Sequence, residues 1–279
     1  MQIPRVWAKA SAKAEFPDGR ELPVAVWGWG EDEATAKSGA ADRLRRVLER
    51  IRRGERFPHQ YGYASRPLRE EILQTFEGSV PGEPSAALTR NSYGAQVLNA
   101  ARLLFLDVDL QPPTLAERVM RLFGKASAEE TALVRLRNAL QEYGRATFRV
   151  YRTASGLRAV AIDRDFDPAA GEVQELMQAT STDPAYSRLC LAQRSFRARL
   201  TPKPWRCKGS LPPGQHPRAE GEPRRRFAEW LNEYERRSAG YATCRYLEKV
   251  GSGSLKGDAR RLLELHDKMT RCNEPLPLA

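Results

Sequence analysis

The stretch RLLFLDVDL at residues 102–110 holds the longest apolar run of the chain and decides the fold class. Its apolar residues fall on both faces of an extended chain, which is typical of a strand buried in the centre of a sheet. Two carboxylates, Asp107 and Asp109, interrupt the run. Residues two apart on a strand point to the same face, so these side chains project together near the end of the strand.

Such a carboxylate pair indicates a nearby cation. Each negative charge raises the pKa of the other unless a cation lies between them, and burying an unpaired charge is costly. Hard oxygen ligands suit Mg²⁺ or Mn²⁺. The alternative is that Asp107 and Asp109 end the strand and face solvent, and the pair alone does not decide between the two.

The chain after this strand alternates helices with strands. Pro112 and Pro113 end the first strand, because proline cannot donate to a sheet. A turn at residues 154–156 joins two expected strands. Apolar spacing predicts helices at 114–123, 128–143, 168–180, 224–237 and 255–270. Strands are expected at 147–153 and 157–162. A short helix followed by a strand is expected within 186–200, and a basic, proline-rich loop at 202–217.

The chain before the strand predicts a small β-β-α module. Residues 7–16 and 22–29 form a hairpin around a Pro-Asp-Gly turn, and an acidic start opens a helix that ends at Gly54. The remaining expected elements are a helix at 68–76 and strands at 87–89 and 93–99. The glycines and prolines of 78–84 mark a domain boundary. The expected fold is therefore α+β: a module with its connecting helix at 1–80, and a core with a central mixed sheet and C-terminal helices at 85–279.

Bulk properties favour a cytoplasmic protein that acts away from membranes. No apolar run reaches the roughly 20 residues of a membrane span, and the first residues lack the apolar segment of a secretory signal. The four cysteines form no closely spaced pair. Buried, reduced thiols are therefore expected, and no zinc site is predicted.

Positive charge is concentrated in one part of the sequence. The chain carries a net charge of +11. Residues 188–226 contain nine arginines and two lysines against two glutamates, a net charge of +9. Such a stretch attracts polyanions, although a solvated surface is the alternative. The excess of arginine over lysine favours phosphate recognition.

Several residues downstream of the aspartate pair are candidates for phosphate binding. Ser155 and Gly156 lie in a small-residue turn whose N–H groups and hydroxyl suit a phosphate, although an ordinary hairpin is the alternative. Arg158 follows on the exit strand. In an extended segment Arg197 and Arg199 share a face, so two guanidiniums could meet one anion. The complete set of candidates is Ser155, Gly156, Arg158, Arg194, Arg197, Arg199 and Lys203.

The order of these motifs resembles the archaeo-eukaryotic primase superfamily, especially its primase-polymerase branch. That family has a strand with Asp-x-Asp, a small-residue turn leading to a histidine strand, and a third acid followed by tyrosine and an Arg-x-Phe-Arg stretch. The resemblance covers roughly residues 87–206. The similar stretches here are Asp107-Val108-Asp109, Ser155-Gly156-Leu157-Arg158, and Asp183 with Tyr186 and Arg194-Ser195-Phe196-Arg197.

The resemblance implies a primase-like two-layer core and metal-dependent nucleotidyl transfer on nucleic acid, with nucleoside triphosphates as substrates. Asp107, Asp109 and Asp183 would be the catalytic residues and hold two Mg²⁺ or Mn²⁺ ions. Arg194 and Arg197 would face the triphosphate. Arg158 stands where the family has histidine, and arginine binds phosphate but cannot relay a proton. This departure bears on catalysis more than on nucleotide binding.

Two other functions fit parts of the sequence. A non-catalytic protein that binds nucleic acid or nucleotide on a primase-like scaffold fits Arg158 and the N-terminal module. Residues 104–109 are also similar to the nucleophile motif of haloacid-dehalogenase-type phosphatases, but that motif places glycine and threonine directly after the second aspartate, and here Thr114 comes too late. No P-loop motif is present.

Overall fold

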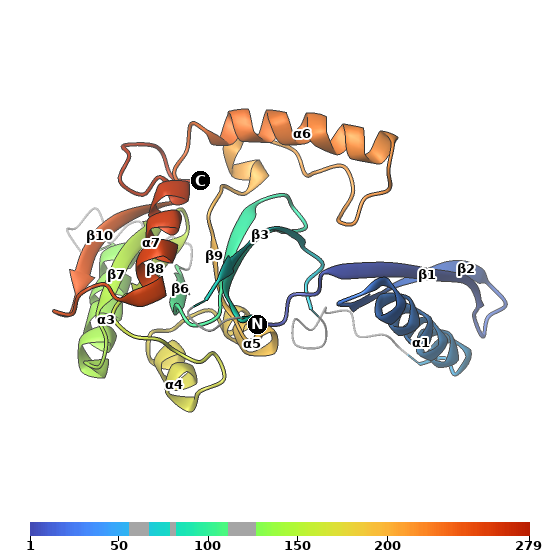
Figure 1. Cartoon of the computed structure of the whole chain (residues 1–279), viewed down its shortest axis with the longest axis horizontal. Coiled ribbons are helices and arrows are strands. Elements are labelled where there is room, and N and C mark those ends of the chain that lie inside the picture. The colour runs from blue at the N-terminus through green and yellow to red at the C-terminus, as the bar shows by residue number, and fades with distance from the viewer. Residues whose placement is uncertain (56–66, 79–81, 111–126) are drawn as a thin grey trace.

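A computed structural model of the chain describes residues 1–55, 67–78, 82–110 and 127–279. It is an α+β structure in which all pairings between the named strands of these residues are antiparallel. The expected α+β class is confirmed. Figure 1 shows a hairpin and helix at one end of the molecule and two further sheets with their helices in the rest.

The N-terminal module has the expected β-β-α order. Strands β1 (Val6–Glu15) and β2 (Glu21–Gly30) form a hairpin, and α1 (Glu33–Arg52) packs against it. The Asp32 side chain accepts a hydrogen bond from Thr35 N and caps the helix. A β-carbon at Gly28 would lie 2.1 Å from the backbone nitrogen of Ala40, so only glycine permits this close approach of strand and helix.

The second sheet has the order β3-β4-β5-β9. Its strands are β3 (Glu71–Glu77), β4 (Pro84–Arg90), β5 (Gln96–Ala100) and β9 (Phe196–Arg199). The helix expected at 68–76 is wrong, because most of that segment is β3. Pairing with β4 supplies its hydrogen bonds and overrides the local pattern. Residues 71–77 thus belong to the core sheet, and not to the module at 1–80 to which the composition assigned them.

The third sheet has the order β10-β7-β8-β6. It contains β6 (Phe105–Asp109), β7 (Phe148–Thr153), β8 (Gly156–Ala161) and β10 (Cys244–Val250). The first three were expected and the last was not. Instead of one central mixed sheet, the core has two sheets in which all neighbouring strands are antiparallel. Parallel neighbours need a βαβ crossover connection, and no neighbouring pair of the named strands has one.

Six described α-helices surround these sheets. Besides α1 they are α3 (Ala128–Tyr143), α4 (Gly171–Ala179), α5 (Pro184–Gln193), α6 (Glu222–Ser238) and α7 (Gly257–Thr270), with a short 3-10 helix η1 (Pro204–Cys207). These positions confirm the helices expected at 128–143, 168–180, 224–237 and 255–270, and the short helix then strand within 186–200. The helix expected at 114–123 lies outside the described residues.

Helices α3 and α7 lie on opposite faces of the third sheet (Figure 1). Tyr143 of α3 packs its ring against Phe148 of β7. The next residue, Arg149, forms an ion pair with Asp267 of α7, with 3.0 Å between Nη2 and Oδ2. Successive strand residues point to opposite faces. The face that carries Arg149 also carries Asp107 and Arg158, so α7 packs on the side of the sheet that holds the candidate site.

The core is continuous between the two larger sheets. Its largest buried side chains come from both sheets and from α3, α4 and the loops between them: Tyr151, Phe105, Phe148, Phe166, Phe196, Leu98, Leu104, Leu106, Leu136, Leu140, Leu157 and Met177. All four cysteines are buried and unbridged. Within the described ranges, no helix combines the length and apolar character needed to cross a membrane.

Candidate phosphate-binding site

Asp107 and Arg158 form a bidentate ion pair where β6 and β8 lie side by side. The two residues are direct partners in the register of these strands. Arg158 Nε donates to Oδ1 of Asp107 at 2.8 Å, and Nη2 donates to Oδ2 at 3.2 Å. The Arg158 side chain is only 3% exposed. Of the two alternatives that the sequence left open for Asp107, the structure therefore shows a cation beside it, and this cation is the Arg158 guanidinium.

Asp109 and Asp183 lie near this pair. The backbone N–H of Asp183 donates to the carbonyl oxygen of Asp107 at 3.0 Å, which brings the start of α5 to β6. Burial raises the pKa of Asp109, and the negative charges of Asp107 and Asp183 raise it further. The three carboxylates that the resemblance grouped as catalytic are thus neighbours in space.

Two of these carboxylates already have partners that a metal ion would have to displace. Both oxygens of Asp107 accept from Arg158. Oδ1 of Asp183 accepts from Ala185 N at 2.9 Å and caps α5. No group of three or more histidine, cysteine, aspartate or glutamate side chains among the described residues is placed to hold a metal ion. Metal binding by Asp107 and Asp183 would therefore require these contacts to be exchanged for contacts to the metal.

His266 of α7 lies directly behind Arg158. Nη1 of Arg158 is 3.4 Å from Nε2 of His266, and Nδ1 of His266 is 2.9 Å from Oδ1 of Asp267. Burial lowers the pKa of His266. A neutral ring that donates from Nδ1 to Asp267 and accepts at Nε2 from Arg158 satisfies both contacts. The pair His266-Asp267 thus supports the guanidinium that holds Asp107.

Three further cations gather beside this network, and we call Arg199, Lys203 and Arg206, together with Ser155, the cationic site. Arg199 ends β9, Lys203 precedes η1, and Arg206 lies within η1. Nη2 of Arg206 donates to Oγ of Ser155 at 3.0 Å, so η1 meets the turn between β7 and β8. Nη1 of Arg158 donates to the Arg199 carbonyl oxygen at 3.1 Å. The cationic site therefore lies where the two larger sheets meet.

The cations of the site lie close enough to repel one another. Burial lowers the pKa of Arg199, and the charges of Arg158 and Arg206 act in the same direction. Burial also lowers the pKa of Lys203, with Arg199 and Arg206 adding to the effect and Asp109 opposing it. Like charges in a partly buried position destabilise each other unless an anion joins them.

Two buried donors of the site have no hydrogen-bond acceptor within the part of the chain that the structure describes. They are Nε of Arg199 and Nη1 of Arg206. A buried charged donor without an acceptor costs free energy of about 1–3 kcal/mol or more. An anion bound within reach of both donors would satisfy them and reduce the repulsion between the two charges.

The other predicted phosphate ligands have different surroundings. Gly156 packs against β6, where a β-carbon would lie 2.0 Å from the Val108 carbonyl oxygen, so its close approach to the backbone explains the glycine. Arg194 ends α5 with a φ of 48° and is exposed, at the opposite end of β9 from Arg199. Arg158 is enclosed by protein partners. These three residues therefore do not belong to the cationic site.

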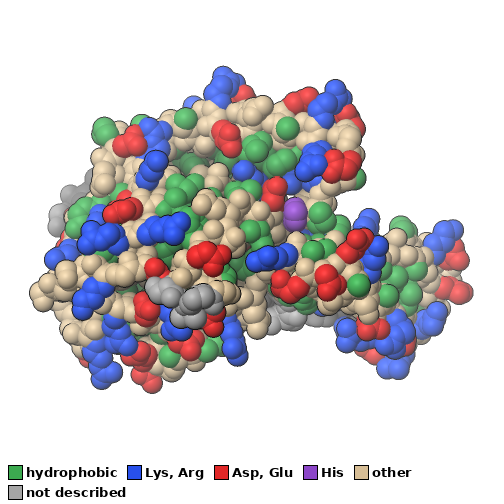
Figure 2. Space-filling view, in the orientation of Figure 1, with side chains coloured by type: hydrophobic (Ala, Val, Ile, Leu, Met, Phe, Trp, Pro, Cys, Tyr) green, Lys and Arg blue, Asp and Glu red, His purple; other side chains and the backbone are tan. Residues whose placement is uncertain are grey.

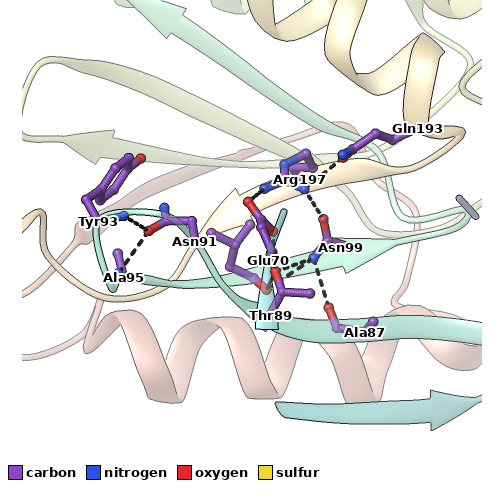
Figure 3. A network of polar contacts seen from close by, with 10 residues as sticks. Glu70, Ala87, Thr89, Asn91, Tyr93, Ala95, Asn99, Gln193 and Arg197 are labelled. Carbon is purple, nitrogen blue, oxygen red and sulfur yellow. Dashed lines mark hydrogen bonds and ion pairs between the residues drawn. The ribbon is translucent and has the colours of Figure 1, made fainter. Parts of the chain in front are cut away.

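Arg197 belongs to a buried polar network in the second sheet (Figure 3). Its Nη2 is 2.6 Å from Oε1 of Glu70, and Nη1 donates to the side-chain oxygens of Asn99 and Gln193. The two charged side chains are 8% and 4% exposed. The guanidinium that was expected to face a triphosphate faces protein instead, because Glu70 comes from the segment before β3, which the sequence pattern did not connect to β9.

Several arginines of the basic sequence segment are paired with glutamates. Arg224 and Arg225 of α6 pair with Glu220 and Glu222 within one helical turn, and Arg218 lies 3.6 Å from Glu71. On the face drawn in Figure 2, Lys and Arg side chains alternate with Asp and Glu side chains. The net charge of +9 already counts Glu220 and Glu222, and the pairs of Arg197 with Glu70 and of Arg218 with Glu71 reduce it by two. Arg199, Lys203 and Arg206 gather at the cationic site.

Sequence reasoning missed Arg206 and His266. Arg206 lies in the basic segment, but its closeness to Ser155 depends on the fold. His266 lies in a helix that the apolar spacing predicted, but that spacing gives the histidine no role. His266 and Asp267 are adjacent in the sequence, but nothing in the sequence connected them to Arg158.

Comparisons with known proteins give no relative for this chain. No family model, no curated protein and no solved structure matches it. The function is therefore argued from the residues of the site alone.

Proposed function

We propose that this protein binds phosphate groups of a nucleic acid or nucleotide at the cationic site. The observation that carries the proposal is the pair of buried N–H groups of Arg199 and Arg206 that find no acceptor in the described part of the chain. Guanidinium groups match phosphate oxygens in geometry and form charge-assisted hydrogen bonds with them. The Ser155 hydroxyl, which accepts from Arg206, keeps its own O–H free to donate to the same anion.

The position of the site also suits a phosphate. It lies at the junction of β9, η1 and the turn before β8, so charged and polar groups from three separate segments come together. Arg199 is held by its backbone in the second sheet and by the bond from Arg158 to its carbonyl oxygen. Donors fixed before binding lose little conformational entropy when the ligand arrives.

The test is ligand binding by full-length protein with Arg206→Ala. We would measure fluorescence anisotropy with a labelled single-stranded oligonucleotide and, separately, with a labelled nucleoside triphosphate. The slope of log affinity against log salt should fall by about 0.7 for each phosphate of a single strand that the variant no longer neutralises. Arg206→Ala should weaken binding and reduce the slope for whichever ligand the protein uses.

Arg225→Ala is the matched control, because Arg225 is an exposed arginine already paired with Glu222 on α6. It should leave affinity and slope unchanged. Equal loss in both variants would mean that general positive charge, and not the cationic site, attracts the ligand. Unchanged binding in Arg206→Ala would contradict the proposal.

The second candidate is metal-dependent nucleotidyl transfer, as the primase resemblance implies. The observation that favours it is the gathering of Asp107, Asp109 and Asp183 beside the cationic site, which raises the pKa of Asp109. A metal ion would have to compete with Arg158 for Asp107 and with the helix cap for Asp183. Asp109 has neither engagement and is the carboxylate most available to a cation.

Primer extension with labelled nucleotides and Mg²⁺ or Mn²⁺ tests this candidate. Asp109→Asn is the informative variant, because removing Asp107 would also leave the buried Arg158 without its partner. Asp165→Asn, at an exposed aspartate, is the control. Product in wild type and Asp165→Asn but not in Asp109→Asn would support transfer. Absence of product in all three, with oligonucleotide binding intact, would leave the binding function alone.

The cytoplasm is the compartment that both proposals require, because nucleic acids and nucleotides are found there. Four buried, unbridged cysteines agree with a reducing compartment. Partial proteolysis of intact and lysed cells followed by detection of the chain would locate it.

A further inference from the structure

An exposed tryptophan, Trp205, lies within the cationic site. It stands between Lys203-Pro204 and Arg206 in the chain and belongs to η1. Its surface is 52% exposed, and it is the only tryptophan among the exposed large apolar residues of the described chain. An indole in water loses the favourable burial that tryptophan usually has, so its position between two cations needs an explanation.

The backbone around Trp205 is well fixed, so the indole is presented outward by the fold. Pro204 and Cys207, on either side of it in η1, are buried. The Gly209 N–H donates to the Pro204 carbonyl oxygen at 2.7 Å and closes the turn. Because Pro204 and Cys207 are buried and Trp205 is half exposed, the indole extends away from the core.

Two neighbours orient the indole. The ring of Tyr93, from the turn between β4 and β5, meets it nearly edge to face, with centroids 5.4 Å apart. Nζ of Lys203 lies 5.5 Å from the ring centroid. These contacts hold the ring beside the cations and leave about half of its surface open. A flat aromatic surface next to phosphate-binding donors is the combination that binds single-stranded nucleic acid, in which bases stack while the backbone follows positive charge.

We propose that Trp205 is a stacking platform for a base of single-stranded nucleic acid whose phosphate occupies the cationic site. The inference rests on the proposed function and adds the substrate class. A duplex keeps its bases stacked on one another, so it cannot offer a base to Trp205 without unstacking. The open position of the indole also suits a strand that continues past the site more than a nucleotide enclosed in a pocket.

The test compares a single strand with an abasic strand of equal charge, which differ only in their bases, and adds a duplex and a nucleoside triphosphate. Full-length protein is titrated with a labelled single-stranded oligonucleotide, with an abasic strand of the same length, with its duplex and with a nucleoside triphosphate. Wild type should bind the single strand roughly tenfold more tightly than the abasic strand, the range expected for one stacked base. The duplex and the triphosphate should bind more weakly than the single strand.

The variants are Trp205→Ala, Trp205→Phe and, as a matched control, Leu211→Ala. Leu211 is another exposed apolar residue nearby in the chain, 63% exposed. Trp205→Ala should lose roughly tenfold in affinity for the single strand, with an unchanged salt slope and no further loss on the abasic strand. Trp205→Phe should retain most of the affinity, and Leu211→Ala all of it. Because Trp205 is exposed, thermal unfolding of each variant should match wild type.

Equal affinity of wild type for the single and abasic strands, or unchanged single-strand binding in Trp205→Ala, would overturn the inference. Tighter binding of the triphosphate than of the strand would overturn the substrate class. If Arg206→Ala weakens binding while Trp205→Ala does not, only the stacking inference fails. If neither variant changes binding, the proposed function fails as well.

Discussion

Replacing Arg197 with methionine separates the role implied by the sequence resemblance from the role given by the structure. If Arg197 faced a triphosphate, the variant would lose ligand binding and keep its stability. In the structure Arg197 is paired with Glu70 below the surface, with 2.6 Å between Nη2 and Oε1. Methionine keeps much of the apolar stem and removes only the charged group, so the Glu70 carboxylate stays buried without its cation.

The expected loss of stability follows from this burial. Both side chains are less than a tenth exposed. Breaking a buried ion pair by removing one partner costs about 3–5 kcal/mol. The oxygens of Asn99 and Gln193 lose a donor as well, so the upper part of that range is expected. For a domain of this size, such a loss lowers the unfolding temperature by roughly 10–20 °C.

The assay is urea unfolding followed by circular dichroism and tryptophan fluorescence, alongside oligonucleotide binding at a temperature where the variant is folded. Arg194→Met is the control, since Arg194 is exposed, and it should stay within about 0.5 kcal/mol of wild type. The double variant Arg197→Met/Glu70→Met should recover part of the loss, because it removes the buried charge as well. A stable Arg197→Met protein with weakened ligand binding would refute the structural role.

Three further predictions concern the charged groups behind and beside the cationic site. Arg158→Met should lower the free energy of chemical unfolding by about 1–3 kcal/mol, because the partly buried Asp107 loses the guanidinium that pairs with it. A decrease of less than about 0.5 kcal/mol would count against a stabilising ion pair. Since the pKa of Asp109 is raised, oligonucleotide affinity at fixed ionic strength should rise as the pH falls through that pKa, because protonation removes a negative charge near Lys203. Asp109→Asn should bind tightly throughout and show a weaker pH dependence, and identical pH profiles would contradict the assignment. Burial lowers the pKa of His266, so as the pH falls the unfolded state binds a proton at this histidine before the folded state does. The free energy of unfolding should therefore decrease as the pH drops below about 6.5. Thermal unfolding of His266→Gln should show a smaller decrease, and a decrease equal to that of wild type would show that another group causes it.

The sequence indicated local structure well where the pattern of apolar residues was strong. Leu133, Leu136 and Leu140 fall at helical spacing within the helix predicted at 128–143, and α3 begins and ends at these bounds. Its start is fixed by the Ser127-Glu130 capping box and its end by Gly144 in the left-handed region. The hairpin with its Pro-Asp-Gly turn was equally clear. Signals of this kind lie within a few residues of each other and do not depend on the rest of the chain.

Strands that depend on distant partners were less predictable. Residues 71–77 were expected to be helical, but β4 supplies their hydrogen bonds. β10 was not expected at all, and it lies against β7 about a hundred residues earlier in the chain. The pairing register of β6 and β8, which places Asp107 opposite Arg158, could also not be predicted from either segment alone. Sheet pairing is a non-local choice, so the local pattern gives only part of it.

By itself, the sequence determined the α+β class, most helices and the shared face of Asp107 and Asp109, and it proposed Arg199 and Lys203 as candidate phosphate ligands. Only the tertiary structure decided which charge meets which. It gave Asp107 the Arg158 guanidinium and placed Arg197 against Glu70. It also left one donor each of Arg199 and Arg206 without an acceptor among the described residues. The physical reason is that the effect of a charge depends on its distance to other charges and on its burial, and both are set by segments that lie far apart in the chain.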